Sequence, residues 1–241
     1  MDGALFRNGP PQLTDLRQSH KRGNCYQVAA IASAIVRQGG PEKIQQIMRD
    51  NGDGTVTVRF PKADVTVDKT RITTEDGYPA FDTGADWAHL LEKAMAAYSF
   101  MEHPNRSVDD GYMRDVFDDL SHIMGPPNDD AADVEASTNR FYIDNMDHMQ
   151  GLPHQWDGII QRGMEHHVPV AFSTQNDDYA GKKNKRILPG HKYPILGLAK
   201  HKGKDGYLVF DPHGISAGPY PNRQIQDDTL KLQSARRGDS P

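Results

Sequence analysis

Residues 18–26 read Gln18-Ser19-His20-Lys21-Arg22-Gly23-Asn24-Cys25-Tyr26, and the apolar run Val28-Ala29-Ala30-Ile31-Ala32 follows directly. Beyond Cys25, apolar side chains recur at the three- and four-residue spacing of an amphipathic helix packed on a core. The pattern therefore predicts that Cys25 opens a helix. Unpaired backbone N–H groups and the positive end of the helix dipole lie at such a position, and both favour the thiolate form of a cysteine.

Cys25 is the only cysteine among the 241 residues. A lone cysteine before an apolar helix is more often a packing residue than a catalytic one. Two polar residues downstream favour the catalytic interpretation, because His191 begins a predicted strand and Asp211 directly follows another. A Cys, a His and an Asp in this order suit nucleophilic acyl transfer, in which a thiolate attacks, an imidazole moves the proton and a third polar group fixes the tautomer.

Composition narrows the class of protein. A single cysteine excludes an internal disulfide framework and a zinc site with several cysteines, and it suits a reducing compartment. The formal net charge of −5 and the lack of a basic stripe argue against nucleic acid as a partner. No apolar run is long enough for membrane insertion, and Met1–Gly9 lacks a secretory signal. We therefore expect a protein of the cytoplasm, or one delivered to a host or target-cell cytosol without a classical signal peptide.

Local patterns predict the elements of the N-terminal half. They are a helix over Glu42–Arg49, strands over Thr55–Phe60 and Asp64–Val67, and a helix over Asp86–Tyr98. The spacing of the last helix places Glu92 and Lys93 on its outer side. The turn Asn51–Gly54 offers oxygen ligands for calcium, but it lacks the remaining ligands of an EF-hand loop, and its Asn-Gly and Asp-Gly pairs are ordinary turn formers.

Between Glu102 and Gln150 the sequence becomes polar and acidic, and its pattern is weaker. The predicted elements are helices over Met113–Ser121 and Trp156–Glu165, and strands over Phe141–Ile143, Val168–Ser173, His191–Leu198 and Tyr207–Phe210. The last two strands form a predicted hairpin, whose register would bring Asp211 back toward His191. The remaining histidines, among them His20, His148, His154 and His166-His167, show no pattern of metal ligands.

Five motifs in order resemble the calpain-type cysteine protease core, a member of the papain-like clan. The motifs are Gly23-Asn24-Cys25-Tyr26, Asn51–Phe60, Trp87–Ala94, Gly190-His191-Lys192-Tyr193 and Asp211-Pro212-His213-Gly214. The resemblance covers most of the chain, from Gln18 to Gly214. It implies an α+β fold with one catalytic domain in two lobes: a helical lobe that carries the nucleophile, and an antiparallel sheet lobe that carries the His and the Asp. The break at Gly125–Asp130 predicts the junction, so the lobes are expected over residues 1–125 and 126–241.

The resemblance also implies roles for particular residues. Cys25 is the expected nucleophile, His191 the general acid and base, and Asp211 the residue that orients the imidazole. Gln18 and the backbone N–H of Cys25 are the expected donors of the oxyanion hole. The chain departs from the family pattern at three points: Gln18 stands seven residues before the cysteine instead of six, Asp211 replaces an asparagine, and His213 replaces a tryptophan.

These features predict a cysteine-type peptidase that cleaves protein substrates through a thioester acyl-enzyme. Two alternatives stay open: a glutamine deamidase or transglutaminase on the same scaffold, which Asp211 favours, and a catalytically inactive binding module in which Cys25 is buried. No cofactor or metal is expected; calcium regulation stays open, although the sequence identifies no ligands for it. A compact core of this kind suits a bacterial enzyme, or an effector or toxin delivered into another cell.

Overall fold

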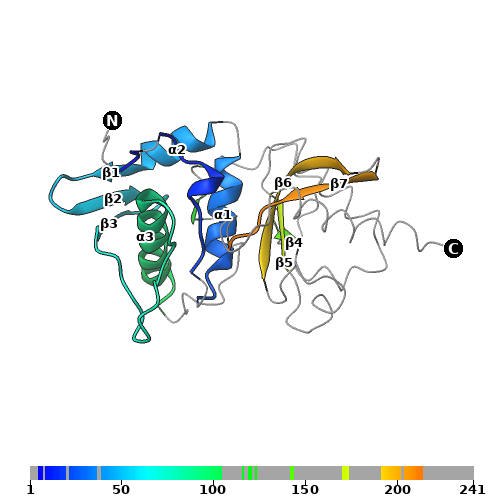
Figure 1. Ribbon diagram of the computed structural model, residues 1–241. Coiled ribbons are helices and arrows are strands. Elements are labelled where there is room, and N and C mark those ends of the chain that lie inside the picture. The colour runs from blue at the N-terminus through cyan, green and yellow to red at the C-terminus, as the bar shows by residue number, and fades with distance from the viewer. Residues whose placement is uncertain are drawn as a thin grey trace. The chain divides into compact units, whose positions relative to one another are not determined.

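The computed structural model describes residues 5–7, 9–19, 22–36, 39–104, 116, 119–120, 123, 142–143, 170–173, 191–201 and 204–213 (Figure 1). The chain divides into two compact units. Unit 1 contains residues 1–126 and 212–214, and unit 2 contains residues 127–211 and 215–241. Helices combine with mainly antiparallel sheets, so the fold is α+β, as the sequence predicts.

Unit 1 contains helices and a small sheet. Its elements are the short 3-10 helix η1 (Leu13–Asp15), the helices α1 (Cys25–Ile35), α2 (Gly40–Ile47) and α3 (Asp86–Glu102), and the strands β1 (Met48–Asp50), β2 (Thr55–Arg59) and β3 (Asp64–Asp68). The strands pair antiparallel in the order β1-β2-β3. Val56 faces Val67 and Val58 faces Val65 across β2 and β3, which places the four valines on one face.

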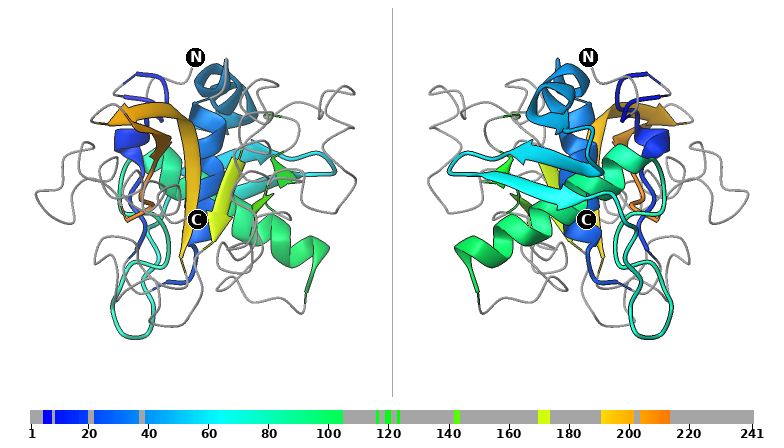
Figure 2. Two further views of the ribbon diagram at one scale, coloured as in Figure 1. Left: turned by 90° about the vertical axis from the view of Figure 1, so that its right-hand side faces the viewer. Right: turned by 90° about the vertical axis from the view of Figure 1, so that its left-hand side faces the viewer.

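The helix α3 covers this valine face (Figures 1 and 2). All four valines are buried, and the ring of Phe60 stacks on that of Tyr98 at a centroid distance of 4.4 Å. Burial alternates along β3, as expected for a strand with one covered face. In β2 the predicted alternation of burial is incomplete, because Thr57, on the opposite face from Val56 and Val58, is buried as well. The other side of α3 meets α1, whose eleven residues are all buried.

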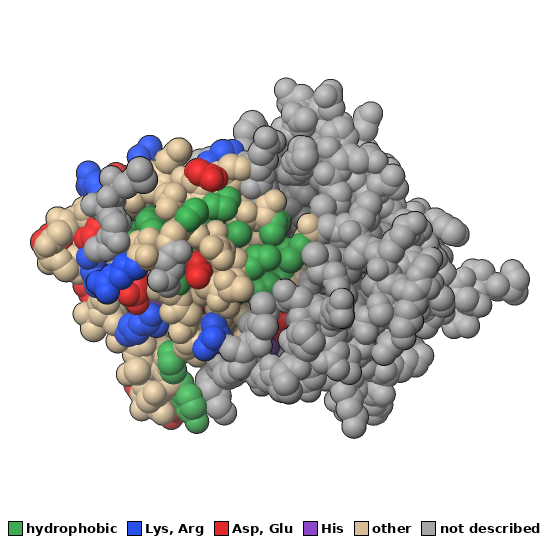
Figure 3. Space-filling model, turned by 45° about the horizontal axis from the view of Figure 1, so that its top comes forward, with side chains coloured by type: hydrophobic (Ala, Val, Ile, Leu, Met, Phe, Trp, Pro, Cys, Tyr) green, Lys and Arg blue, Asp and Glu red, His purple; other side chains and the backbone are tan. Residues whose placement is uncertain are grey.

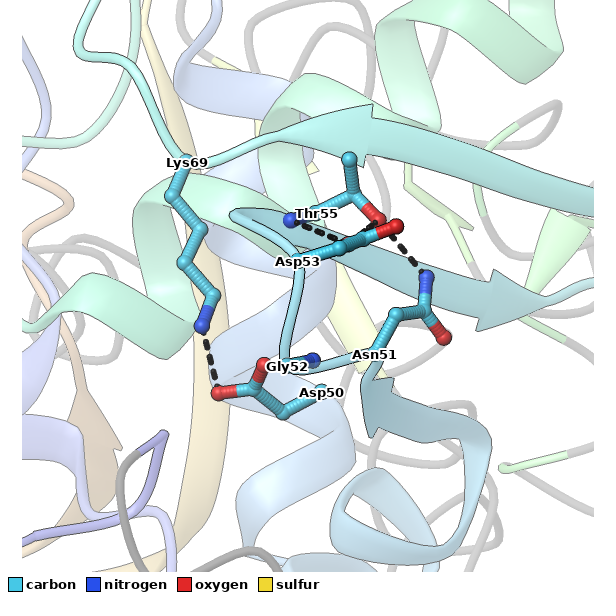
Figure 4. Close-up of polar contacts among 6 residues, drawn as sticks. All are labelled: Asp50, Asn51, Gly52, Asp53, Thr55 and Lys69. Atoms are coloured by element: carbon cyan, nitrogen blue, oxygen red, sulfur yellow. Dashed lines mark hydrogen bonds and ion pairs between the residues drawn. The ribbon is translucent and has the colours of Figure 1, made fainter.

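The polar turn between β1 and β2 is closed by its own side chains (Figure 4). Asp50 accepts the N–H of Gly52 at 3.0 Å and pairs with the Lys69 ammonium at 2.5 Å. Asp53 accepts the N–H of Thr55 at 3.0 Å, and Asn51 donates to the Thr55 hydroxyl at 2.8 Å. Hydrogen bonds lower the pKa of both aspartates. The bond from Lys69 has the largest effect on Asp50, and the bond that the Thr55 hydroxyl donates to Asp53 has the largest effect on Asp53.

Unit 2 contains a sheet of four strands in the order β4-β5-β6-β7. They are β4 (Tyr142–Ile143), β5 (Val170–Ser173), β6 (Lys192–His201) and β7 (Lys204–Val209). The hairpin β6–β7 confirms the predicted pairing, with Leu198 opposite Tyr207 and an irregularity between Ile195 and Gly197. The sheet is not wholly antiparallel, because β4 runs parallel to β5. Residues 144–169 connect these two strands, and a parallel pair needs a long connection of this kind.

Two helices differ from their predicted limits. The second helix ends at Ile47 instead of Arg49, because Met48 and Arg49 pair with β2 as part of β1. The helix α3 continues four residues beyond Tyr98, to Glu102. The predicted helix Trp156–Glu165 lies outside the described residues, as does most of Met113–Ser121. Within the described part of the chain, no helix is both long and apolar enough to cross a membrane.

Basic and acidic side chains lie beside one another on the face of unit 1 that Figure 3 shows. The ion pairs of this unit include Arg71 with Asp86 at 2.8 Å, and Lys62 with Glu102. The exposed pairs are solvated and contribute little to stability. The main source of stability in unit 1 is therefore the apolar contact among α1, α3 and the sheet.

Gly40 tests how closely α2 approaches α1. A Cβ atom at Gly40 would lie 1.9 Å from the carbonyl oxygen of Ala34, so α2 has to shift away from α1. We expect Gly40→Ala to lower the free energy of unfolding by about 1–3 kcal/mol, as overpacking does. Gln46→Ala, at an exposed position of the same helix, is the control and leaves it nearly unchanged. Urea denaturation measures both, and equal effects would contradict the close approach.

Candidate active site

Cys25 is the first residue of α1, as the sequence predicts, and its side chain is buried. The N-cap residue is Asn24, whose side chain makes no capping hydrogen bond to the helix. Its amide Nδ2 donates instead to Oε1 of Glu92, and its Oδ1 is buried without a hydrogen bond among the described residues. The residue beside the expected nucleophile is therefore oriented by α3 instead of by its own helix.

Glu92 lies at the centre of these contacts and is fully buried, so its predicted outward position is wrong. Its Oε1 accepts the Asn24 amide, and its Oε2 accepts the backbone N–H of Asp82. The error has a physical reason. The side of α3 that carries Glu92 is covered by the start of α1 and by the loop that contains Asp82, which a helical period cannot reveal.

Lys93 is also buried, against the prediction that it faces outward. Its ammonium donates to the backbone carbonyls of Asp68 and Thr70 at 2.8 and 3.1 Å, and lies 3.0 Å from the Asp68 carboxylate. Threonine and lysine hydrogen bonds hold the pKa of Asp68 at about 2. Lys93 thus joins the end of β3 to α3, and its charge is matched by oxygen atoms.

Asp82, on the loop before α3, is also a buried acid whose oxygens accept hydrogen bonds. Its Oδ2 accepts the N–H of Arg17 at 2.7 Å, and its Oδ1 accepts the N–H of Gly84 at 2.6 Å. The carbonyl of Asp82 lies 3.2 Å from Nδ1 of His89, which therefore donates to it. Asp82 and Glu92 together form a buried carboxyl pair, joined through the Asp82 N–H.

Residues 15–19, which precede Cys25 and are called the Gln18 segment, lie along the loop that contains Asp82. Thr83 donates its N–H to the carbonyl of Arg17 at 2.8 Å, and Ala85 donates to that of Asp15 at 2.9 Å. The Ser19 hydroxyl donates to the Pro79 carbonyl at 2.6 Å, and the Trp87 indole donates to Asp15. Hydrogen bonds at both ends and in the middle of the Gln18 segment therefore fix its position within unit 1.

Gln18 is almost fully buried within this segment. Its Nε2 donates to the carbonyl of Arg22 at 2.9 Å, three residues before Cys25. Its backbone N–H donates to the carbonyl of Pro212 at 2.8 Å, and its Oε1 makes no hydrogen bond among the described residues. An amide nitrogen carries two hydrogens, so the bond to Arg22 leaves a second donor. The role of Gln18 as an oxyanion donor stays a prediction.

Burial sets the protonation of the carboxyl pair. It raises the pKa of Asp82 to about 7, against hydrogen bonds from Arg17 and Gly84 and the charges of Arg71 and Arg17. Burial also raises the pKa of Glu92 well above its usual value, and the negative charge of Asp82 raises it further. Like charges in one buried site resist joint ionisation, so the pair retains a proton near neutral pH.

His191 and Asp211 lie together in unit 2. His191 immediately precedes β6, and Asp211 follows Phe210, whose N–H donates to the Pro194 carbonyl at 3.1 Å. Nε2 of His191 lies 3.7 Å from Oδ1 of Asp211. The imidazole is buried and packs edge-on against the Tyr193 ring, at a centroid distance of 4.8 Å. At this distance an imidazolium is stabilised by the carboxylate.

The four expected site residues therefore fall into two sets. Gln18 and Cys25 belong to unit 1, and His191 and Asp211 belong to unit 2. The pairing of Cys25 with His191 stays a prediction. His213 is half-buried, whereas His20, His148, His154 and His166-His167 lie outside the described residues. Among the residues that the structure does describe, no group of three or more His, Cys, Asp or Glu side chains is placed to hold a metal ion.

Sequence reasoning missed the carboxyl pair. A usable signal exists at Glu92, because Leu90, Leu91, Ala94, Met95 and Ala96 surround it with apolar side chains on nearly every side of the helix. A helix that is apolar all round is buried, and a charged residue within it needs a partner. Asp82 gives no comparable signal, since Asp is common in loops.

A scan of the chain against protein-family models finds no matching family, and a search of curated proteins finds no relative. The resemblance to the calpain-type core therefore stays a prediction from the five motifs.

The raised pKa values predict how stability changes with pH. The folded protein binds more protons at Asp82 and Glu92 than the unfolded chain does, so these groups stabilise the fold at low pH. That contribution is lost as the pH rises from about 4, near the unfolded pKa, through the folded value of about 7 at Asp82. Each unit of pKa shift corresponds to about 1.4 kcal/mol.

Glu92→Gln isolates this effect, because glutamine accepts the Asp82 N–H and donates to Asn24 if the Asn24 amide turns over. We expect the free energy of unfolding of the wild type, minus that of Glu92→Gln, to fall between pH 4 and pH 8. Asp82→Asn should give a difference of the same sign. Urea denaturation at several pH values measures both, and a difference that rises with pH in this window would contradict the raised pKa values.

Proposed function

We propose that the chain is a cysteine-type peptidase that cleaves protein substrates through a thioester acyl-enzyme, on a papain-like scaffold of the calpain type. The observation that carries the proposal is the approach of His191 Nε2 to Asp211 Oδ1, at 3.7 Å, on adjoining strand ends. An imidazole held by a carboxylate is the proton carrier that a thiol nucleophile requires. The position of Cys25 at the first turn of α1 supports its assignment as that nucleophile.

The proposed reaction assigns one role to each residue. With Nε2 directed toward Asp211, Nδ1 of His191 takes the thiol proton. The Cys25 sulfur then forms a bond to the carbonyl carbon, and the resulting oxyanion accepts hydrogen bonds from Gln18 and the Cys25 N–H. His191 returns the proton to the leaving nitrogen as the C–N bond breaks. Water, deprotonated by His191, hydrolyses the thioester and releases the acid and the thiol.

Asp211 also supports a second candidate function, that of a glutamine deamidase or transglutaminase. A carboxylate in place of asparagine favours the imidazolium by its charge. The same acyl-enzyme chemistry acts on a glutamine side-chain amide, which gives deamidation with water or transamidation with an amine. The substrate therefore distinguishes a peptidase from a glutamine deamidase or transglutaminase.

Mass spectrometry of treated proteins tests the proposal. Unfolded casein, with and without an added primary amine, is incubated with wild type and with Cys25→Ala and His191→Ala variants. We expect new peptide termini with the wild type and a loss of about a thousandfold or more in either variant. Asp211→Asn keeps an oxygen for the imidazole, so it should retain more activity than Asp211→Ala.

Other outcomes have definite meanings. Conversion of glutamine to glutamate, or incorporation of the amine without chain cleavage, favours the second function. Equal products from wild type and Cys25→Ala would mean that Cys25 is not the nucleophile, and the buried cysteine would then be a packing residue.

A further inference from the structure

Two segments that carry expected oxyanion donors are fixed to the same pair of buried acids. Glu92 binds Asn24, the residue before Cys25, and Asp82 binds the N–H of Arg17, the residue before Gln18. The Asp82 N–H joins the two acids by donating to Glu92. A single hydrogen-bonded chain thus runs from the start of α1, through α3 and its preceding loop, to the segment of Gln18.

The attachment of Asn24 is unusual for an N-cap residue. An N-cap asparagine normally accepts a backbone N–H of its own helix. Here the side chain is almost fully buried, makes no such bond, and donates to Glu92. Contact with Glu92 therefore decides where the first turn of α1 begins relative to α3.

The attachment of Arg17 is equally restricted. Besides the bond to Asp82, its carbonyl accepts from the N–H of Thr83, so both backbone groups of Arg17 face the loop. A Cβ at Gly84 would lie 1.8 Å from the Asp15 carbonyl oxygen, which shows how closely the two backbones pack. The position of Gln18 consequently follows the position of this loop.

Charged groups on several elements act on the pair. Arg22 faces it from the segment before α1, Arg17 from the Gln18 segment, and Arg71 from the irregular segment between β3 and α3. His89 and Lys93 belong to α3 itself, and burial lowers the pKa of His89, which keeps that ring neutral. The three arginines offset the negative charge that the pair retains.

We propose that Glu92 and Asp82 are positioning residues of the active site, which hold the start of α1 and the Gln18 segment at the spacing that the thiolate and the oxyanion donors require. The inference rests on the proposed function. Neither acid touches the substrate. Each acts through a backbone segment, Glu92 through Asn24 and Asp82 through Arg17, so their loss alters Cys25 reactivity in a protein that is still folded.

Alkylation of Cys25 by iodoacetamide, followed by intact mass between pH 5 and pH 9, tests the inference. Glu92→Leu removes both acceptors, and Glu102→Gln, on the same helix, is the matched control. We expect Glu92→Leu to slow alkylation near pH 6 by about tenfold and to move the midpoint of the pH profile upward, because the helix start no longer favours the thiolate. The control should match the wild type.

A second set of variants remains informative if Glu92→Leu does not fold. Asn24→Asp places a second carboxyl against Glu92 and should slow alkylation about tenfold. Asn24→Asp combined with Glu92→Gln restores a donor and acceptor, now exchanged, and should recover the wild-type rate and midpoint. Circular dichroism confirms that each variant is folded before its thiol is compared.

Failure of the inference and failure of the proposed function give different results. A low midpoint in the wild type that rises in His191→Ala, but stays unchanged in folded Glu92→Leu or Asn24→Asp, overturns the positioning role alone. A wild-type midpoint equal to that of an ordinary thiol, or unaffected by His191→Ala, overturns the proposed function and the inference with it.

Discussion

The buried carboxylate of Glu92 is the constraint on which unit 1 depends. It accepts one N–H from the start of α1 and another from the loop before α3, inside a core of alanine, valine and leucine side chains. A buried acid is tolerated only where its oxygens accept hydrogen bonds. Removal of one donor leaves a buried oxygen without a hydrogen bond, which lowers the free energy of unfolding. The start of α1 and the loop are therefore fixed together by the same side chain.

The proposed chemistry uses what this constraint fixes. Cys25 stands at the first turn of α1, where the backbone favours a thiolate, and the Gln18 amide is held against the carbonyl of Arg22. In the proposal, proton transfer is assigned to the His191 imidazole and the Asp211 carboxylate, which flank the hairpin of unit 2. A rigid scaffold for each half of the chemistry is what a site with small geometric tolerance requires.

Local sequence patterns predict most elements of unit 1, because a helix start and a strand with one buried face follow from neighbouring residues. Cys25 at the start of α1 and the alternation in β3 are examples. The helical period places Glu92 and Lys93 on the wrong side of α3, because their burial depends on α1, on a loop and on the end of β3. The hairpin of His191 and Asp211 follows from two short runs, whereas contacts between distant segments, such as Asp82 with Arg17, have no local signature.

The central claim is that Glu92 and Asp82 keep a proton inside the fold while they hold α1 in place. Difference infrared spectroscopy of wild type against Glu92→Gln and Asp82→Asn, recorded at pH 6, observes that proton directly through the carbonyl stretch of a protonated carboxylic acid. The account predicts that this band is present in the wild type and altered in both variants. Carboxylate bands alone at both positions would contradict it.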